Sequence, residues 1–402
     1  MTDDLKVIRD NVKEQVILES EGRYDCSDED ILELINEKLL NYPGYIPYKK
    51  KLAVIREIYN SLRRFDLISD LMEDDDITDI MVNGTSEIFI EKNGVVSPSG
   101  YRFESEKKLE DVIQQIVAGH NRVVNESDPI VDVRMPDGSR VNIVLPPIAI
   151  NGPILKIRKF PTQDLTMEKY IRIGTITREA SEFLKKLVIS GYNIFISGGT
   201  GSGKTTFLNV LSDYIPKDER IITIEDSAEL RIQGIDNLVR LETRNANLEG
   251  NNEVSMTDLI KSSLRMVPDR IVVGEVRGKE VIDMLQAMNT GHDGSLSTGH
   301  ANSSYDMISR LETLVLMARD IPLAAVKRQI ASALDIIIHL GRTTDKVRRV
   351  MEISEVGFSD GEIVLNKLFY YDYAKGMFVR SKNSMKATGK LIRAGYEKEV
   401  IF

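Results

Sequence analysis

A glycine-rich run, Gly198-Gly-Thr-Gly-Ser-Gly-Lys-Thr205, is the part of the chain whose residue types and spacing point most clearly to chemistry. It matches the pattern G-x4-G-K-[ST] in full. It lies between an apolar run typical of a strand, residues 192–197, and one typical of a helix, residues 206–211. In that context the glycines let backbone N–H groups converge on phosphate oxygens at the positive end of the helix. The run therefore predicts a nucleotide-binding loop.

The loop gives individual side chains expected roles. Lys204 is expected to reach the β- and γ-phosphates of ATP, and the Thr205 hydroxyl is expected to bind Mg²⁺. A chance match would leave only a glycine-rich turn, but the strand before it and the helix after it argue against that alternative. The residues expected to contact the nucleotide are Gly198, Gly199, Thr200, Gly201, Ser202, Gly203, Lys204, Thr205 and Thr206.

Two glutamates are candidates for the acidic chemistry that hydrolysis of a nucleoside triphosphate requires. Glu225 ends the apolar run Ile221-Ile-Thr-Ile, and Glu275 follows the run Arg270-Ile-Val-Val-Gly. Ligands bind at the carboxyl ends of parallel strands, so acids placed there can hold Mg²⁺ or align the attacking water. Either could instead be a solvated acid at a strand exit. The sequence leaves open which of the two activates water.

Histidine is scarce, and two of the four residues fall in the small, polar, glycine-rich segment 290–302, which predicts a loop beside a strand. His292 and His300 lie eight residues apart, with no cysteine and no helical i, i+4 partner, so zinc is disfavoured. A phosphate-sensing or loop-ordering role is preferred for this segment. His120 and His339 are expected to be structural.

Strands and helices must alternate around the loop to bring these side chains together. The order of apolar runs and helical stretches predicts an α/β domain with a mostly parallel sheet covered on both faces. Beyond them, residues 350–380 predict short strands with turns at Asp360-Gly361 and Lys375-Gly376. The expected helix before the loop and the expected strands are 178–190, 192–197, 221–224, 237–241 and 270–274.

The first part of the chain has a different texture. Strand and turn signals such as Asn83-Gly84, around a helix expected at 105–119, predict an α+β domain. The charged segment before it is predicted to be helical, with Ser27 capping one helix. The predicted divisions are a helical segment at 1–65, an α+β domain at 66–160, a linker or hinge at 161–176 and the ATPase domain with a C-terminal extension at 177–402.

Composition sets the limits of this picture. The chain has 402 residues and a formal net charge of −9, which argues against coating nucleic acid through overall charge. Its single cysteine, Cys26, excludes an internal disulfide and a multi-cysteine zinc site. No apolar run approaches the roughly 18–20 residues of a membrane span, and the acidic start is unlike a secretory signal. These features predict a cytoplasmic protein.

Four stretches in order resemble the type II/type IV secretion ATPase superfamily, ring-shaped ATPases of the cell envelope. They are the loop 198–205, an acidic box at 223–229, a glutamate strand at 270–278 and a histidine box at 297–302. Further stretches are most similar to the branch of tight-adherence pilus assembly ATPases, the CpaF/TadA-type group. They are residues 81–84, 136–141 and 326–333.

This resemblance implies a RecA-like C-terminal motor domain, a smaller N-terminal α+β domain and a homohexameric ring. ATP and Mg²⁺ would be bound between the domains, with Glu225 and Glu275 polarising water and organising Mg²⁺, and Glu275 and Thr205 as its expected ligands. His300 would sense the γ-phosphate, while Arg140 and Arg158 would clamp it. The implied partner is an inner-membrane platform protein, which would hold the ring at the cytoplasmic face of the membrane. No direct contact with nucleic acid is expected.

The chain departs from the resemblance at three points, one of which is that the helical motif expected near the C-terminus of retraction motors is not evident. Its one cysteine disfavours the zinc-bearing type II exporters, and Val267 stands where an arginine is expected. The expected function is ATP hydrolysis that drives pilus assembly or protein secretion. The alternatives are an ATPase that powers DNA or effector export and a nucleotide-gated scaffold without hydrolysis. A GTPase is disfavoured, because no Asn-Lys-x-Asp motif is found.

Overall fold

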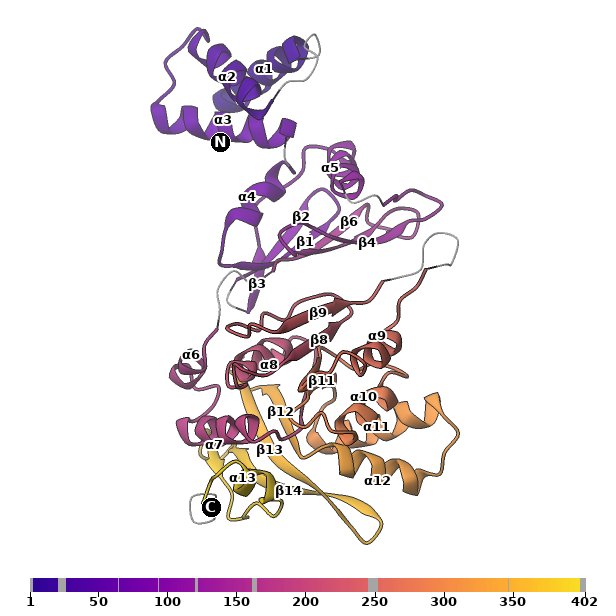
Figure 1. The fold of residues 1–402 in the computed structure, drawn as a ribbon. Helices are drawn as coiled ribbons and strands as arrows, with labels where there is room; N and C mark the ends of the chain where they lie inside the picture. Colours follow the sequence, from indigo (N-terminus) through magenta and orange to yellow (C-terminus); the bar gives the residue numbers. More distant parts are fainter. Residues whose placement is uncertain are drawn as a thin grey trace. The chain divides into compact units, whose positions relative to one another are not determined.

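The computed structural model divides the chain into two compact units, residues 1–162 and 163–402. It describes residues 3–20, 27–63, 65–92, 94–119, 122–160, 165–244, 252–345 and 347–397. Cys26 and His120, together with residues 161–164 of the expected linker, therefore lie outside the described residues. Figure 1 shows the two units with their elements labelled.

The first unit begins with a three-helix bundle. Ser27 caps its second helix as expected, since the Ser27 side chain accepts from the N–H of Asp30 and the Asp30 side chain accepts in return. Apolar residues at helical spacing close a small core between the helices, including Val12, Ile35 and Val54. The helices are α1 (Asp3–Ser20), α2 (Asp28–Leu40) and α3 (Tyr48–Arg63).

An antiparallel sheet with helices makes up the rest of this unit, in the order β3-β2-β1-β6-β5-β4. The α+β texture expected from the sequence is confirmed, and the expected helix at 105–119 is α5, which buries Leu109, Ile113 and Ile116 against the sheet core. The elements are α4 (Leu67–Glu73), β1 (Ile77–Asn83), β2 (Glu87–Lys92), β3 (Val95–Pro98), α5 (Glu106–Ala118), β4 (Ile130–Arg134), β5 (Arg140–Val144) and β6 (Ile154–Arg158).

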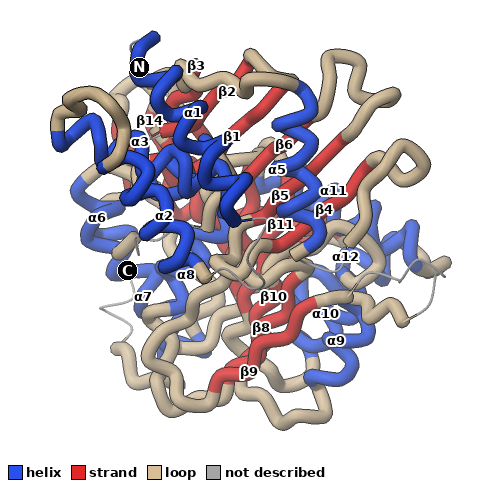
Figure 2. The backbone as a smooth tube through the Cα atoms, turned by 90° about the horizontal axis from the view of Figure 1, so that it is seen from above, coloured by secondary structure: helices blue, strands red, loops and turns tan. Residues whose placement is uncertain are grey.

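The second unit is built on a sheet with the order β15-β14-β13-β12-β7-β11-β10-β8-β9, whose strands from β12 to β9 run parallel. Figure 2 shows the strands within this arrangement. The elements that precede β10 are α6 (Met167–Arg172), α7 (Arg178–Ile189), β7 (Ile194–Gly198), α8 (Lys204–Ser212), β8 (Ile221–Glu225), β9 (Leu238–Glu242) and α9 (Met256–Ser263).

The remaining elements of this unit continue the sheet past the parallel strands, so the expected α/β class is confirmed. They are β10 (Arg270–Val273), α10 (Val281–Asn289), β11 (Leu296–His300), α11 (Ser304–Ala318), α12 (Leu323–Ala333), β12 (Ile336–Arg342), β13 (Arg348–Ser359), β14 (Glu362–Asp372), β15 (Met377–Arg380) and α13 (Gly389–Arg393).

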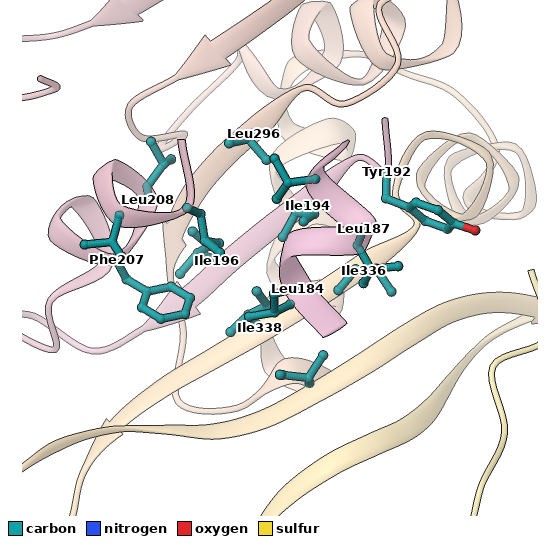
Figure 3. Packing of buried hydrophobic residues seen from close by; sticks show 14 of the residues in the cluster. Leu184, Leu187, Tyr192, Ile194, Ile196, Phe207, Leu208, Leu296, Ile336 and Ile338 are labelled. Carbon is teal, nitrogen blue, oxygen red and sulfur yellow. The ribbon is translucent and has the colours of Figure 1, made fainter. Parts of the chain in front are cut away.

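Side chains that alternate along β7 separate two cores, one on each face of the sheet. Ile194 and Ile196 pack with α7 and α8, as Figure 3 shows, whereas Phe195 packs with α9 to α12. All three are fully buried, which explains why this strand reads as a continuous apolar run rather than an alternating one. The strand is thereby fixed from both faces at the point where the glycine-rich loop leaves it.

Two expectations for this unit were wrong. The segment predicted as a loop beside a strand contains β11, in the middle of the sheet, because small residues are what fit there: a Cβ on Gly299 would lie 2.9 Å from the ring of Phe195. The strands predicted to be short include β13 and β14, with 12 and 11 residues. Their hairpin turns at Asp360-Gly361, where both residues have positive φ, as expected for such a turn.

None of the helices in the described ranges combines the length and the apolar character that a membrane crossing requires.

Candidate active site

The glycine-rich loop joins β7 to α8, as the sequence predicts. Close contacts and backbone conformation explain why several of its positions are glycine. A Cβ on Gly198 would lie 2.5 Å from the Ser202 hydroxyl and 2.6 Å from the Leu340 carbonyl oxygen, so a side chain has no room there. Gly201 and Gly203 have φ values of 69° and 92°, a backbone conformation that favours glycine. The first helical residue after this loop is Lys204, followed in the same turn by Thr205 and Thr206.

The Lys204 side chain is buried and lies against the loop and the neighbouring strand. Its Nζ donates to the Gly199 carbonyl oxygen at 3.1 Å and lies 3.2 Å from Nδ1 of His300. Burial, together with the positive charge of Arg277, lowers the pKa of Lys204 below its usual value, although the Glu275 carboxylate opposes that shift. A buried cation of this kind gains from an anionic ligand such as a phosphate.

His300 ends β11 directly beside the loop, since it pairs in register with Gly198. Its Nδ1 faces the Lys204 ammonium, which can only donate, so the network assigns the ring proton to Nε2. That nitrogen lies 2.9 Å from Oε1 of Glu275. Burial and the nearby Lys204 lower the pKa of His300, which favours the neutral ring. The histidine therefore bridges the lysine and the glutamate.

Glu275 follows β10 and is held by Arg277, whose Nη2 donates to its Oε2 at 2.8 Å. Burial alone would raise the pKa of Glu275, but Arg277, His300 and Lys204 outweigh it, and the net pKa is lowered. Its Oε1 is buried without an aligned hydrogen bond among the described residues. Sequence reasoning assigned no role to Arg277. Its position two residues after Glu275 in the glutamate strand could have marked it as a partner of that carboxylate.

Glu225 ends β8, the strand beside β10, and its surroundings differ from those of Glu275. Its Oε1 accepts the N–H groups of Glu229 and Leu230 at 2.8 and 2.9 Å, while its Oε2 is buried without a partner among the described residues. Burial raises the pKa of Glu225 to about 7, against the lowering effect of the two N–H donors. The Glu225 side chain packs over Gly274: a Cβ on Gly274 would lie 2.9 Å from Cγ of Glu225.

The second unit thus brings Lys204, His300 and Glu275 into one chain of contacts, with Glu225 at the end of the adjacent strand. The described residues hold no group of three or more His, Cys, Asp or Glu able to cage a metal. This donor set suits Mg²⁺, which binds through one or two protein oxygens plus substrate phosphates. The Thr205 hydroxyl on α8 and the buried Oε1 of Glu275, which has no aligned hydrogen bond among the described residues, are such donors.

The two arginines predicted to clamp phosphate lie in the first unit, where they face each other in register. Arg140 on β5 pairs with Arg158 on β6, and Arg134 on β4 pairs with Arg140. Directly opposite residues lie on the same face of a sheet, so three guanidinium groups form one row. Asp79 on β1 continues it, 3.3 Å from Nε of Arg158. Sequence reasoning missed Arg134, although it flanks the same turn as Arg140.

Three further residues singled out by the sequence have separate surroundings. Nδ1 of His292 lies 3.1 Å from the Ala287 carbonyl oxygen, away from the contacts of His300. The ring of His339 lies 2.9 Å from the Ser197 hydroxyl, on the strand beside the loop. Val267, which stands where an arginine was expected, is 83% exposed and has a φ of 54°, a strained conformation for a β-branched residue.

The site and fold agree with a family model described as "Type II/IV secretion system protein", which matches residues 62–374. The chain belongs to this family. With its phosphate loop, its buried lysine and two glutamates at the ends of neighbouring strands, it is an ATP-hydrolysing enzyme of the type II/IV secretion ATPase superfamily. The bundle of α1 and α2, and most of α3, precedes the matched residues.

Known relatives agree with this assignment. The "Conjugal transfer protein TrbB" of Rhizobium radiobacter is 32% identical over 75% of this chain and 90% of its own length. The "Type IV secretion system protein PtlH" of Bordetella pertussis is 34% identical over 58% of this chain and 76% of its own length. The X-ray structure of the Yersinia pseudotuberculosis ATPase DotB shares the fold, with a TM-score of 0.54 and 18% identity over 80% of this chain and 82% of that one.

Proposed function

We propose that this ATPase drives pilus assembly or protein secretion across the cell envelope, in the manner of the tight-adherence branch that its motifs resemble. The observation that carries the ATP-hydrolysing part of the proposal is the contact chain Lys204–His300–Glu275 beside a complete phosphate loop. The choice of cargo rests instead on the resemblance of residues 81–84, 136–141 and 326–333. A site that only held nucleotide would not need a histidine linking the phosphate-binding lysine to a buried carboxylate. The second unit provides both binding and acid–base groups.

The two glutamates divide the chemistry by their charge states. The lowered pKa of Glu275 keeps it anionic, which suits it, with the Thr205 hydroxyl, to hold Mg²⁺. When bound, Mg²⁺ would neutralise charge on the phosphates. The pKa of about 7 suits Glu225 to accept a proton from the attacking water near neutral pH. Lys204 binds the phosphates, and His300 responds to the γ-phosphate through Lys204.

The arginines of the first unit would convert hydrolysis into motion. Arg140 and Arg158 form part of a row whose charges suit the γ-phosphate, because guanidinium groups bind phosphate oxygens in pairs. Loss of that phosphate would release them, so the first unit would move by a hinge motion biased by differential contacts. The hinge would lie at the start of the expected 161–176 linker, because α6 and Ile176 within that range pack into the core of the second unit. In a homohexameric ring, such steps would act on an inner-membrane platform protein from the cytoplasmic face of the membrane.

A second function, the export of DNA or effectors, is favoured by the relatives whose names refer to conjugal transfer and type IV secretion. The motor chemistry would be the same, and the cargo would differ. Gene neighbours separate the two: genes for pilins and a prepilin peptidase support pilus assembly, whereas genes for conjugation support DNA transfer.

Steady-state phosphate release from purified full-length protein tests the proposed chemistry. Lys204→Ala and Glu275→Gln are each expected to lower turnover by at least about 100-fold. Arg393→Gln, an exposed change on α13, serves as the matched control and should retain turnover. Wild-type turnover in both site variants would overturn the mechanism, and no phosphate release from the wild type would support the scaffold alternative.

A further inference from the structure

Two arginines outside every motif reach the phosphate loop from β12 and β13. Nη2 of Arg342 donates to the Gly201 carbonyl oxygen at 3.1 Å, and Nε of Arg348 donates to the same oxygen at 2.9 Å. Arg342 ends β12 and Arg348 begins β13, and the two are register partners across the hairpin. Both guanidinium groups therefore converge on one atom of the loop from two paired strands.

The tip between these strands is organised by one carboxylate, Asp345. It accepts from Nη1 and Nη2 of Arg349 at 2.7 Å each, and from the Thr343 hydroxyl and the Val347 N–H at 2.6 and 3.1 Å. The hydrogen bonds from Arg349 hold the pKa of Asp345 far below its usual range. Arg349 also lies over the ring of Tyr371 at 5.7 Å. Asp345 thus holds Arg349, while Arg342 and Arg348 contact the loop.

The grip on Gly201 has a geometric consequence for the loop. A trans peptide unit is planar, with its carbonyl and its N–H on opposite sides, so fixing the Gly201 carbonyl also fixes the direction of the Ser202 N–H. That N–H is directed into the loop, where it donates to the Gly199 carbonyl oxygen at 3.3 Å. Phosphate loops bind through N–H groups that converge inside them, so the arginines hold the loop in its binding shape.

The same contacts have an electrostatic consequence. A Cβ on Gly201 would lie 3.1 Å from Nη2 of Arg342, and one on Gly203 would lie 3.6 Å from Cδ of Arg348, so both side chains lie against the loop backbone. Each brings a permanent positive charge to the edge of a site that must accept an anionic nucleotide. Such charge favours the bound polyphosphate and weakens as salt screens it.

We propose that Arg342 and Arg348 are positioning residues for nucleotide binding, and that the β12–β13 hairpin acts as a clamp on the phosphate loop. The inference rests on ATP binding at this loop and not on the cargo of the machine. The clamp acts on bound ADP and ATP alike, because the loop holds the phosphates that both share. Its loss should therefore weaken binding of both nucleotides and leave the chemical step largely intact.

The experiment measures the dissociation constants of fluorescent ADP and ATP analogues, with KM and kcat from phosphate release, for R342Q, R348Q and the double variant. The double variant is expected to raise both dissociation constants and KM by about tenfold, with kcat changed by less than about threefold. Its affinity should also depend less steeply on salt. Asp345→Asn removes a carboxylate that holds the tip and does not contact the loop itself. It should raise both dissociation constants and KM severalfold.

Two controls keep the result interpretable. R393Q, an exposed arginine on α13, should bind nucleotide like the wild type, and thermal unfolding without nucleotide reports whether each variant is folded. If the double glutamine variant does not fold, R342K/R348K replaces it: with the charge retained but the guanidinium fork lost, its affinity for both nucleotides is expected to lie below that of the wild type.

Three results would overturn the proposal. They are dissociation constants within twofold of the wild type in folded glutamine variants, a loss of kcat at unchanged affinity, and wild-type affinity in R342K/R348K. Failure of the proposed function would look different, because K204A would then retain turnover whatever the arginine variants do.

Discussion

The two ends of the parallel sheet treat buried polar groups in opposite ways. At the carboxyl ends of β8 and β10, Glu225 and Glu275 each bury an oxygen without an aligned hydrogen bond, and their pKa values are displaced in opposite directions. At the amino end of β7, Asn193 is fully buried and uses every polar atom of its side chain. The glutamate oxygens at the carboxyl end can still accept a hydrogen bond, whereas both polar atoms of the Asn193 side chain are already bonded.

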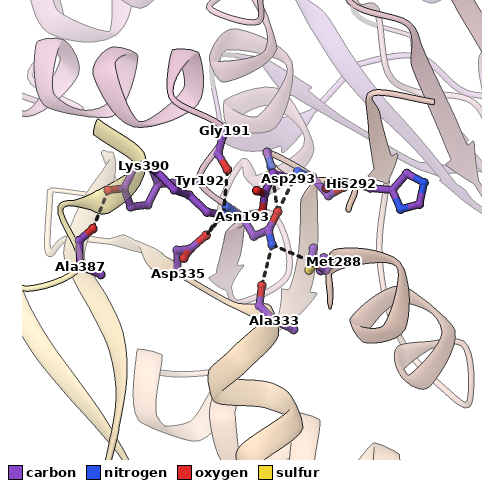
Figure 4. Close-up of polar contacts among 12 residues, drawn as sticks. Gly191, Tyr192, Asn193, Met288, His292, Asp293, Ala333, Asp335, Ala387 and Lys390 are labelled. Carbon is purple, nitrogen blue, oxygen red and sulfur yellow. Dashed lines mark hydrogen bonds and ion pairs between the residues drawn. The ribbon is translucent and has the colours of Figure 1, made fainter. Parts of the chain in front are cut away.

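The asparagine joins four segments of the second unit, as Figure 4 shows. Its Oδ1 accepts the N–H groups of Gly294 and Ser295 at 2.9 and 3.0 Å. Its Nδ2 donates to the Ala333 and Met288 carbonyl oxygens at 2.8 and 3.3 Å. These contacts tie the start of β7 to the ends of α10 and α12 and to the approach of β11.

The C-terminal segment is fastened to the same end. Nζ of Lys390 on α13 contacts the Asp335 and Asp293 carboxylates at 2.8 and 2.7 Å, and the Tyr192 hydroxyl donates to the Ala387 carbonyl oxygen at 2.5 Å. Burial raises the pKa of Asp335, against the opposing effect of Lys390. The difference between the two ends teaches that burial of a polar group does not mark function by itself. At the carboxyl end, carboxylate oxygens that lack an aligned hydrogen bond among the described residues lie at the same end of the sheet as the phosphate loop, and it is this combination that points to function.

Replacing Glu225 by glutamine should give the largest separation of activity from stability. Phosphate release is expected to fall by at least about 100-fold, because the proposed proton acceptor is lost. Stability at pH 8 should not fall, since the raised pKa means that the folded state carries a buried charge there. Turnover and thermal unfolding at pH 8 check both parts. Retained turnover would assign the proton transfer to another group.

Asn193→Ala should show the reverse separation. The change leaves the N–H groups of Gly294 and Ser295 and two carbonyl oxygens without partners, and is expected to lower the free energy of unfolding by about 3 kcal/mol. The KM and kcat of the folded fraction should stay near wild type. Denaturant unfolding measures the loss, with Asn36→Ala on the exposed face of α2 as control. An equal loss in both variants would contradict the structural role.

The pH profile sharpens the same comparison. With a pKa of about 7, Glu225 is protonated below neutrality, so kcat should fall by about tenfold per pH unit below 7 and level off above it. Stability runs the other way: the folded state binds more protons than the unfolded one, so stability falls as pH rises from about 4.5 to 7. In Glu225→Gln, this part of the stability change should vanish. A kcat independent of pH between 6 and 8 would contradict the assignment.

Tyr192→Phe should have the smallest effect. It removes the hydrogen bond to the Ala387 carbonyl oxygen and is expected to lower stability by about 1 kcal/mol without changing turnover. Tyr305→Phe, whose side chain is 70% exposed, is the matched control. A drop in turnover for Tyr192→Phe, with none for Tyr305→Phe, would show that the amino end also serves the chemistry.

What the sequence predicted well was local or depended on a short pattern. The run from β7 through the loop to α8 places apolar residues, glycines and a lysine next to one another, so its structure follows from neighbours in the chain. Ser27 and the Asp360-Gly361 turn are similar cases. By contrast, Leu296 is the one bulky apolar residue of β11, and at Gly299 the side chains of Phe195 and Met307 fill the space that a larger residue would need.

The residues that the sequence missed act over long separations. Asn193 forms hydrogen bonds to groups about a hundred or more positions away. No pattern near it in the chain indicates that its side chain joins several segments. Arg342 and Arg348 reach Gly201 from 141 and 147 positions away. The same applies to the charge states of the glutamates: both end apolar runs, and only the surrounding donors separate their pKa values.

The two amides that bond to Glu225 turn its titration into a spectroscopic signal. Since its Oε1 accepts the N–H groups of Glu229 and Leu230, gain of a proton by the carboxyl weakens both bonds at once. The proton and nitrogen chemical shifts of these amides should therefore follow a single titration curve in a two-dimensional NMR spectrum. The protonation of the proposed base can thus be read from the backbone, without a substitution in the site and without turnover.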